Sequence, residues 1–230
     1  MTPTVPPPRA PSDDGRGPRY ARYTEPYAQW CEEWYQEWYE DGLGWPTASG
    51  PPLGLLTGVR FDVLELPADA GAALLRRTGP TGGPVALSGC GGLVRLLVAE
   101  GSADELPGLL DWLDWGGIAL GLTALGAGGR MAAPVRNAVR DAVRSAAPPR
   151  PAGGAAQGAA VWLRPPEPGR EVEPTLPVLT LSGRGDGNGG RGGGAPDLVR
   201  LVDAAATECH RARLLRGNTF RTNTQPLAFS

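Results

Sequence analysis

Acidic side chains are the residues whose spacing in this sequence could support catalysis. Asp62 lies inside the largely apolar stretch TGVRFDVLELP at 57–67, and Glu65, Asp111 and Asp114 are further acids beside apolar residues. A carboxylate in apolar surroundings is costly unless it is paired, hydrogen-bonded or metal-bound. Clustered carboxylates hold the divalent cations that serve phosphoryl and nucleotidyl transfer. Asp62 is therefore a candidate catalytic residue, and a strand residue that faces water is the alternative.

Two glycine-rich turns could cradle a phosphate with backbone amides. The first is SGCGG, with Ser88, Gly89, Gly91 and Gly92 as candidate phosphate-binding residues, and the second is GAGGR at 126–130. Neither matches a P-loop or a dinucleotide-binding fingerprint. Because the chain contains 35 glycines, ordinary hairpin connections are the alternative for both turns.

Other catalytic and metal-binding patterns are missing from the sequence. His210 is the single histidine, which excludes a metal site built on several histidines and leaves no Ser-His-Asp triad elsewhere in the chain. The three cysteines are far apart and form no CxxC pair, so we expect neither a disulfide framework nor a zinc site. We therefore assign no metal ligand and no cofactor from these residues.

Two segments could contact a partner. Arg211, Arg213 and Arg216 near the end of the chain could contact nucleic-acid phosphates, although arginines at a helix C-terminus also complement the helix dipole. The aromatic segment 27–38 repeats Tyr or Trp at three- and four-residue steps. Its neighbouring carboxylates would repel phosphates, so packing or a protein partner is favoured over base stacking. The C-terminal tail could carry a short partner-binding motif.

The composition bounds the class of protein. The 230 residues carry 24 acids and 22 bases, so a net charge of −2 gives no overall attraction to nucleic acid. The 35 glycines and 25 prolines predict flexible segments around an ordered core. The N-terminal residues show no secretory h-region, and no long uncharged apolar run predicts a membrane span. We expect a cytoplasmic protein without a membrane partner.

The hydrophobic pattern predicts alternating strands and helices. Strands or extended segments are expected at 57–66, at 84–88 and 93–99 as a hairpin, at 118–125 and 131–134 as a second pair around GAGGR, and at 161–166. Helices are expected at 67–77, 104–112 and 197–215, with a further possible helix after 135. This order predicts an α+β domain with a mostly antiparallel sheet and flanking helices. We divide the chain into a disordered leader at 1–19, a domain at 20–182, a Gly-rich linker at 183–196, and a C-terminal helix and tail at 197–230.

The order of these segments resembles a known family. The acidic strand, SGCGG with the following apolar strand, GLTALGAGGRMAAP and AVWLRPPEPGREVEPTLPVL are similar to the N-terminal domain of bifunctional DNA primase/polymerases, the prim-pol family of the archaeo-eukaryotic primase superfamily. GWP at 44–46 is similar to the opening segment of that family. The resemblance covers roughly residues 20–180 and implies a prim-pol-like fold with a role in DNA replication.

In active members the resemblance implies a D-x-D strand, a hairpin histidine and a third acid, which together hold two Mg²⁺ or Mn²⁺ ions and the incoming nucleotide. Asp62 matches the first acid, but Leu64 occupies the second position, and Glu65 belongs to the opposite face of the strand. The histidine position falls near Val94 and the third acid at Thr123, with Leu125 and Ala127 beside it. One carboxylate cannot hold two metal ions.

We therefore expect a catalytically degenerate prim-pol-like protein that acts as a nucleic-acid-associated binding or regulatory module, with Asp62 as a remnant. One alternative is an active primase/polymerase with a remodelled site built from Asp62, Glu65 and Asp111 or Asp114; only in that case would Mg²⁺ or Mn²⁺ be required. The other alternative is a protein–protein interaction module without nucleotide binding.

Overall fold

The structure is a computed structural model that describes residues 33–79, 83–89, 92–135, 160–167, 171–179 and 197–221, with the side chains of the last helix described to Gly217. The expected leader at 1–19, the linker at 183–196, the possible helix after 135 and the C-terminal tail lie outside the described residues.

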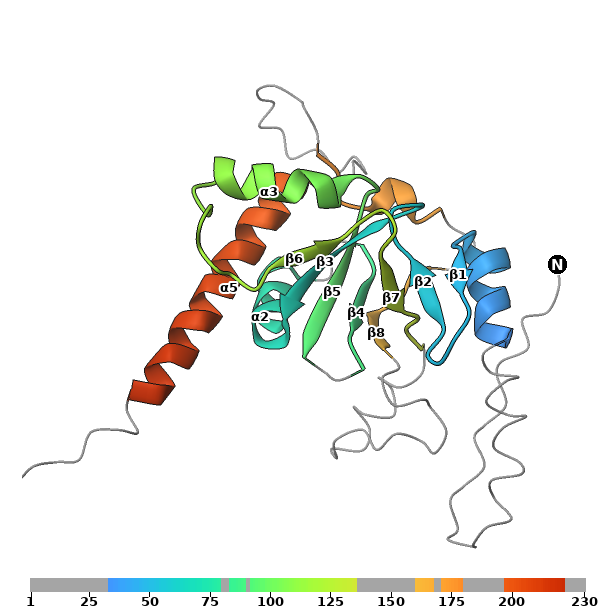
Figure 1. The fold of residues 1–230 in the computed structure, drawn as a ribbon, viewed down its shortest axis with the longest axis horizontal. Coiled ribbons are helices and arrows are strands. Elements are labelled where there is room, and N and C mark those ends of the chain that lie inside the picture. Colours follow the sequence, from blue (N-terminus) through green and yellow to red (C-terminus); the bar gives the residue numbers. More distant parts are fainter. Residues whose placement is uncertain are drawn as a thin grey trace, which may run out of the picture.

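A five-stranded antiparallel sheet forms the centre of the molecule (Figure 1). Its strand order is β6-β3-β5-β4-β8, and the bounds are β3 Asp62–Pro67, β4 Val85–Leu87, β5 Leu93–Val98, β6 Thr123–Leu125 and β8 Val161–Arg164. Helix α2 (Ala68–Thr78) connects β3 to β4, and α3 (Ser102–Trp112) connects β5 to β6. The chain order β-α-β-β-α-β with β3 and β5 adjacent at the centre is the ferredoxin-like arrangement. The predicted α+β class with antiparallel pairing and flanking helices is confirmed.

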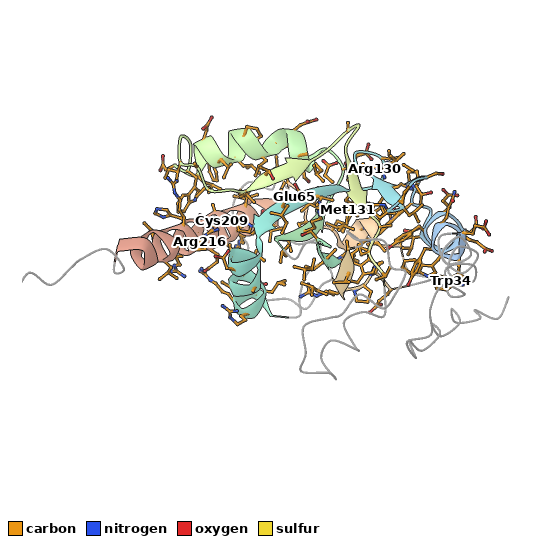
Figure 2. The ribbon with its side chains drawn as sticks, turned by 60° about the horizontal axis from the view of Figure 1, so that its bottom comes forward. Trp34, Glu65, Arg130, Met131, Cys209 and Arg216 are labelled. Atoms are coloured by element: carbon orange, nitrogen blue, oxygen red, sulfur yellow. The ribbon has the colours of Figure 1, made fainter. Side chains whose placement is uncertain are left out.

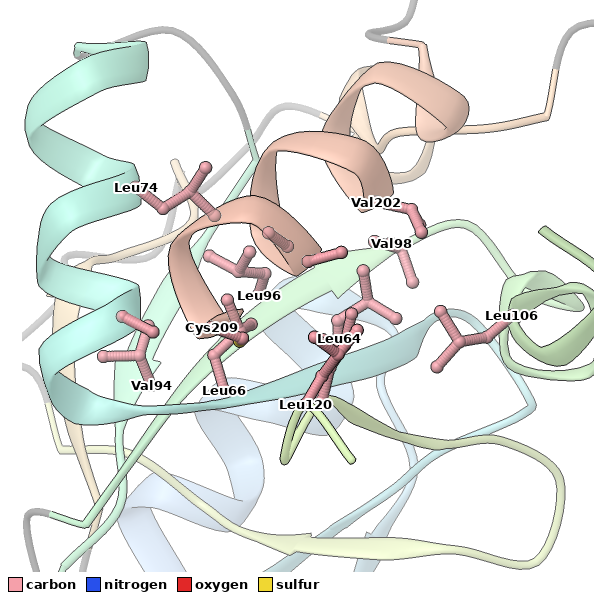
Figure 3. Packing of buried hydrophobic residues seen from close by; sticks show 14 of the residues in the cluster. Leu64, Leu66, Leu74, Val94, Leu96, Val98, Leu106, Leu120, Val202 and Cys209 are labelled. Carbon is pink, nitrogen blue, oxygen red and sulfur yellow. The ribbon is translucent and has the colours of Figure 1, made fainter. Parts of the chain in front are cut away.

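Three helices cover one face of this sheet. Helix α5 (Leu198–Arg221) packs beside α2 and α3, and its buried residues recur at three- and four-residue spacing, as expected for a helix with one apolar face. Figure 3 shows Leu64, Leu66 and Leu96 of the sheet together with Leu74 of α2 and Cys209 of α5. The C-terminal helix thus completes the same hydrophobic core as the central sheet.

The opposite face of the sheet is covered by aromatic residues and by a second, smaller sheet. This sheet has the order β1-β2-β7, with β1 Thr47–Ala48, β2 Gly54–Leu56 and β7 Arg130–Ala132. A helix at 33–43 and the 3₁₀ helix η1 (Glu173–Thr175) lie on the same side. Trp38, Tyr39, Trp45, Phe61 and Trp162 belong to this second core cluster. Both faces of the central sheet are therefore buried.

Two predictions about strands are corrected by the structure. Strand β3 begins at Asp62 rather than at residue 57, because Gly58 has a positive φ of 75° and its amide donates to the carbonyl of Phe61 across 2.9 Å. Val59 is consequently 48% exposed rather than part of the strand. The backbone of residues 57–58 packs directly on the GAGGR turn, where the hydroxyl of Thr57 donates to the carbonyl of Gly126 at 2.7 Å.

The second correction concerns the two strands around that turn. Strands β6 and β7 do not pair with each other: β6 pairs with β3 in the central sheet, and β7 pairs with β2 in the small sheet. The small sheet also includes β1 and β2, for which the sequence analysis predicts no strand. Among the helices that the structure describes, none combines the length and apolar character needed to cross a bilayer.

Candidate functional site

Asp62 occupies the first position of β3, where its side chain meets the N-terminus of α3. The residue is 1% exposed, and its Oδ2 accepts a hydrogen bond from the backbone amide of Ala103 across 2.8 Å. The amides in the first turn of a helix have no partner within the helix, and they carry the positive end of the helix dipole. The carboxylate of Asp62 therefore acts as an acceptor for the start of α3.

Burial sets the protonation behaviour of this carboxyl group. Desolvation raises the pKa of Asp62, hydrogen bonds from the amides of Ala103 and Gly101 oppose the rise, and the charges of Asp104 and Glu100 add to it. Within the described residues, Oδ1 of Asp62 is buried without a hydrogen-bond partner. The environment of the group is a closed contact between β3, α3 and Gly126 rather than an open cleft.

The other positions of the expected metal site lie apart from Asp62. Leu64 shares the face of Asp62 but is fully buried in the core under the three helices. Glu65 lies on the opposite face, where its Oε1 accepts a hydrogen bond from Nε of Arg95 on β5 at 2.8 Å. These two side chains are 12% and 15% exposed and form a largely buried cross-strand ion pair. Figure 2 labels Glu65 at the centre of the molecule.

The remaining acids of the remodelled site are no closer. Asp111 and Asp114 lie at the C-terminal end of α3, whereas Asp62 contacts its N-terminal end. An eleven-residue helix is about 16 Å long, which separates these carboxylates well beyond the span of a metal site. Among the described residues, no group of three or more His, Cys, Asp or Glu side chains is placed to hold a metal ion.

The positions of the expected histidine and third acid carry no acid–base groups. Val94 is 2% exposed and packs against α2 at Gly71. Thr123 faces Glu65 across β6 and β3, and its hydroxyl donates to Oε2 of Glu65 at 3.5 Å. Leu125 packs against the aromatic core. The sheet therefore places a neutral hydroxyl beside an already paired carboxylate.

The candidate phosphate-binding turn is closed by its own hydrogen bonds. The amide of Ser88 donates to the carbonyl of Leu93 at 2.9 Å, and the amide of Leu93 donates to Oγ of Ser88 at 3.0 Å. The carbonyl of Gly92 accepts from the amide of Ala68. Gly89 is exposed at the tip, and Gly91 lies outside the described residues. The described part of this turn has the bonding pattern of a β-hairpin connection.

The three C-terminal arginines all have partners within the protein. Arg211 pairs with Glu208 at 3.0 Å, Arg213 donates to the carbonyl of Ala119 at 2.8 Å, and Arg216 lies 3.5 Å from Asp69. Arg211 and Arg216 remain 62% and 53% exposed, so these pairs are accessible to solvent. Figure 2 shows Arg216 at one end of the molecule and Trp34 at the other.

The aromatic segment 27–38 is described only from residue 33 onward. In that part, Trp38 is 9% exposed and belongs to the second core, which agrees with the packing interpretation for this side chain. Tyr39, outside the predicted aromatic stripe, is fully buried; it donates to the carbonyl of Pro134 at 2.6 Å and accepts from Nε1 of Trp162 at 2.9 Å. Tyr27 and Trp30 lie outside the described residues.

Comparison of the chain with protein-family models, curated proteins and solved structures finds no match. Two strand arginines to which the sequence analysis gave no role, Arg95 and Arg164, are partly buried. An arginine within or at the end of an apolar run that is predicted to be a strand is the signal by which both could have been found, because a guanidinium on a partly buried strand needs a partner. Arg95 has Glu65 as its partner, whereas Arg164, among the described residues, donates to the carbonyl groups of Gly79 and Gly83.

Proposed function

We propose that this chain is a divergent primase/polymerase-like domain that has lost polymerase chemistry and acts in the cytoplasm as a nucleic-acid-associated binding or regulatory module. The observation that carries the loss of chemistry is the environment of Asp62. Its carboxylate is closed against the N-terminus of α3, and the nearest position on the same strand face is the buried Leu64. Two-metal chemistry requires several carboxylates around an accessible cavity.

Primer synthesis and primer extension with Mg²⁺ or Mn²⁺ test the lost activity. We expect no metal-dependent nucleotide incorporation by the wild-type protein. The matched variant is Asp62→Asn, which keeps an oxygen acceptor for Ala103 and therefore preserves the contact with α3. Metal-dependent incorporation that Asp62→Asn abolishes in a folded protein would overturn the proposal and restore the remodelled-site alternative with Glu65, Asp111 or Asp114.

The association with nucleic acid rests on Arg211, Arg213 and Arg216. Exposed ion pairs contribute little net free energy, so phosphates can replace Glu208 and Asp69 as partners of the exposed guanidinium groups. Fluorescence anisotropy with labelled single-stranded and duplex DNA should show binding that weakens with salt, with a slope of about −0.7 to −0.9 per phosphate contact. The Arg211→Gln/Arg213→Gln/Arg216→Gln variant should reduce that slope. Unchanged DNA binding in this variant would show that these three arginines do not contact the phosphates.

A protein–protein interaction module is the second candidate. It is favoured by apolar side chains that remain exposed on α3 and α5: Trp112 is 71% exposed, Leu214 58% and Leu215 69%. Exposed large apolar groups are typical of partner contacts when they gather on one surface. Thermal-shift titration with nucleotides and Mg²⁺ separates the two candidates, since a ligand that binds the native state raises the unfolding temperature. No shift at millimolar nucleotide, together with no anisotropy change with DNA, would favour the interaction module.

A further inference from the structure

A cavity of about 260 Å³ lies in the helical layer, away from Asp62 and from the Ser88 turn. It opens between the C-terminal half of α2, the first turns of α5 and the β4–β5 part of the sheet. Its floor is formed by Leu74, Val85 and Leu96, which are 1%, 2% and 6% exposed. Because an apolar cavity of about 150 Å³ accommodates benzene, this cavity has room for a somewhat larger apolar group.

One wall of the cavity carries an unusual cation. The guanidinium of Arg164, at the end of β8, donates to the carbonyl of Gly79 at 3.0 Å and to the carbonyl of Gly83 at 3.3 Å. These bonds hold it at the C-terminus of α2. In the described part of the chain, no carboxylate pairs with Arg164. Burial lowers the pKa of Arg164.

The charges around the cavity favour an anion. Two arginines, Arg164 and Arg200, and one acid, Asp197, line it, which gives the lining a net charge of +1. The carboxylate of Asp197 is already occupied, since it accepts from the amide of Val199 at 2.9 Å and lies 3.7 Å from Arg200. Among the described residues, the cation of this lining that has no carboxylate partner is therefore Arg164, beside an apolar surface.

We propose that this cavity binds a small carboxylic acid with an apolar tail, with the carboxylate at Arg164 and the tail between Leu74, Leu96 and Leu201. A guanidinium matches the planar geometry of a carboxylate, and pairing in partly desolvated surroundings offsets the cost of burying Arg164. The apolar floor rejects ligands that are hydrated on all sides, such as free phosphate. This site is independent of the proposed function, because it shares no residue with the Asp62 contact or with the C-terminal arginines.

Isothermal titration calorimetry of the full chain tests the site with three probes: octanoate, its neutral analogue octanol, and inorganic phosphate. We expect saturable octanoate binding that is at least about tenfold tighter than octanol binding, with no measurable phosphate binding. No saturable binding of octanoate would overturn the proposal. Equal affinity for octanoate and octanol would also overturn it, because the carboxylate would then not be recognised. Phosphate binding as tight as octanoate binding would overturn it too, because the apolar tail would then not be recognised.

Variants locate the binding. Arg164→Gln should remove the preference for octanoate over octanol, while its amide still donates to a carbonyl of the α2 terminus. Ala204→Phe, which places a ring in the cavity from α5, should abolish binding of both octanoate and octanol. This second variant tests the same cavity if Arg164→Gln does not fold. Arg130→Gln is the matched control, because Arg130 is on β7, donates to the carbonyl of Pro52 outside the cavity and should leave affinity unchanged. Wild-type octanoate affinity in Ala204→Phe would place the binding elsewhere and overturn the proposal.

Discussion

The carboxylate of Asp62 and the backbone amide of Ala103 form a 2.8 Å hydrogen bond that joins the first residue of β3 to the first turn of α3. The two residues are 41 positions apart in the chain. The bond replaces an N-cap side chain, because Gly101 occupies the N-cap position of α3 and has none. An acid that the sequence presents as a candidate for metal chemistry therefore has a defined structural role.

Replacing Asp62 tests that role. Asp62→Ala removes the acceptor of the Ala103 amide and should lower the free energy of unfolding by about 0.5–2 kcal/mol, the range measured for lost helix caps. Asp62→Asn keeps an acceptor of similar shape and should cost less. Urea unfolding followed by circular dichroism measures both variants. Equal losses in the two variants would mean that the hydrogen bond to α3 does not stabilise the fold.

The pH dependence of stability provides a second test of Asp62. Its pKa is raised in the folded protein, so the native state binds the proton more tightly than the unfolded state does. The contribution of this group to stability is greatest below the unfolded pKa, about 3.9, and is lost as the pH rises through the folded pKa. We expect the free energy of unfolding of the wild type to fall relative to Asp62→Asn as the pH rises from about 3 through the folded pKa. A rise in this relative free energy of unfolding with increasing pH would contradict a raised pKa of Asp62 in the folded protein.

Two helical glycines should respond with opposite sign to the same substitution. A Cβ on Gly71 of α2 would clash with Cβ of Val94, whereas a Cβ on Gly108 of α3 would meet nothing within 4 Å. Gly71→Ala should destabilise by about 1–3 kcal/mol, because overpacking outweighs the gain in helix propensity. Gly108→Ala should stabilise by about 0.5–1 kcal/mol. Thermal and urea unfolding measure both, and stabilisation by Gly71→Ala would show that α2 can move away from β5.

The hydroxyl of Tyr39 links the helix at 33–43 to the sheet. Tyr39→Phe leaves Nε1 of Trp162 and the carbonyl of Pro134 without this buried partner. We expect a loss of about 1–3 kcal/mol in the free energy of unfolding, the cost of unsatisfied buried polar groups. Because the substitution removes a single oxygen, packing changes little. A loss below about 0.5 kcal/mol would indicate that other groups replace the hydroxyl.

Glu208 tests the contact between α5 and α2. Its carboxylate is 7% exposed and accepts from Arg77 at 3.3 Å and from Arg211 at 3.0 Å. Glu208→Ala removes both bonds and should cost about 1–3 kcal/mol, which chemical denaturation measures. Arg211→Gln is the matched control; it should cost less than about 1 kcal/mol, because Arg211 is 62% exposed and Arg77 still pairs with Glu208. If Arg211→Gln lowered the free energy of unfolding more than Glu208→Ala does, Arg211 rather than Glu208 would be the more important group in this contact.

The sequence was sufficient for the local elements of the fold. Predicted helices at 67–77 and 104–112 correspond to α2 and α3, and the hairpin at 84–88 and 93–99 corresponds to β4 and β5, because local periodicity reports which face of each element is buried. Strand alternation alone predicted that Leu64 shares a face with Asp62 and that Glu65 lies on the opposite face. The two core clusters of the structure agree with this assignment.

Long-range pairing was decided only by the tertiary structure. The strands on either side of GAGGR are short, and local pattern cannot tell whether they pair with each other or with β3 and β2. The partner of Asp62 depends on where α3 begins after three intervening elements, so no spacing in the chain reveals it. The cavity beside Arg164 likewise forms between α2, α5 and the sheet. Periodicity fixes the face that a residue occupies, whereas its environment depends on which distant element packs against that face.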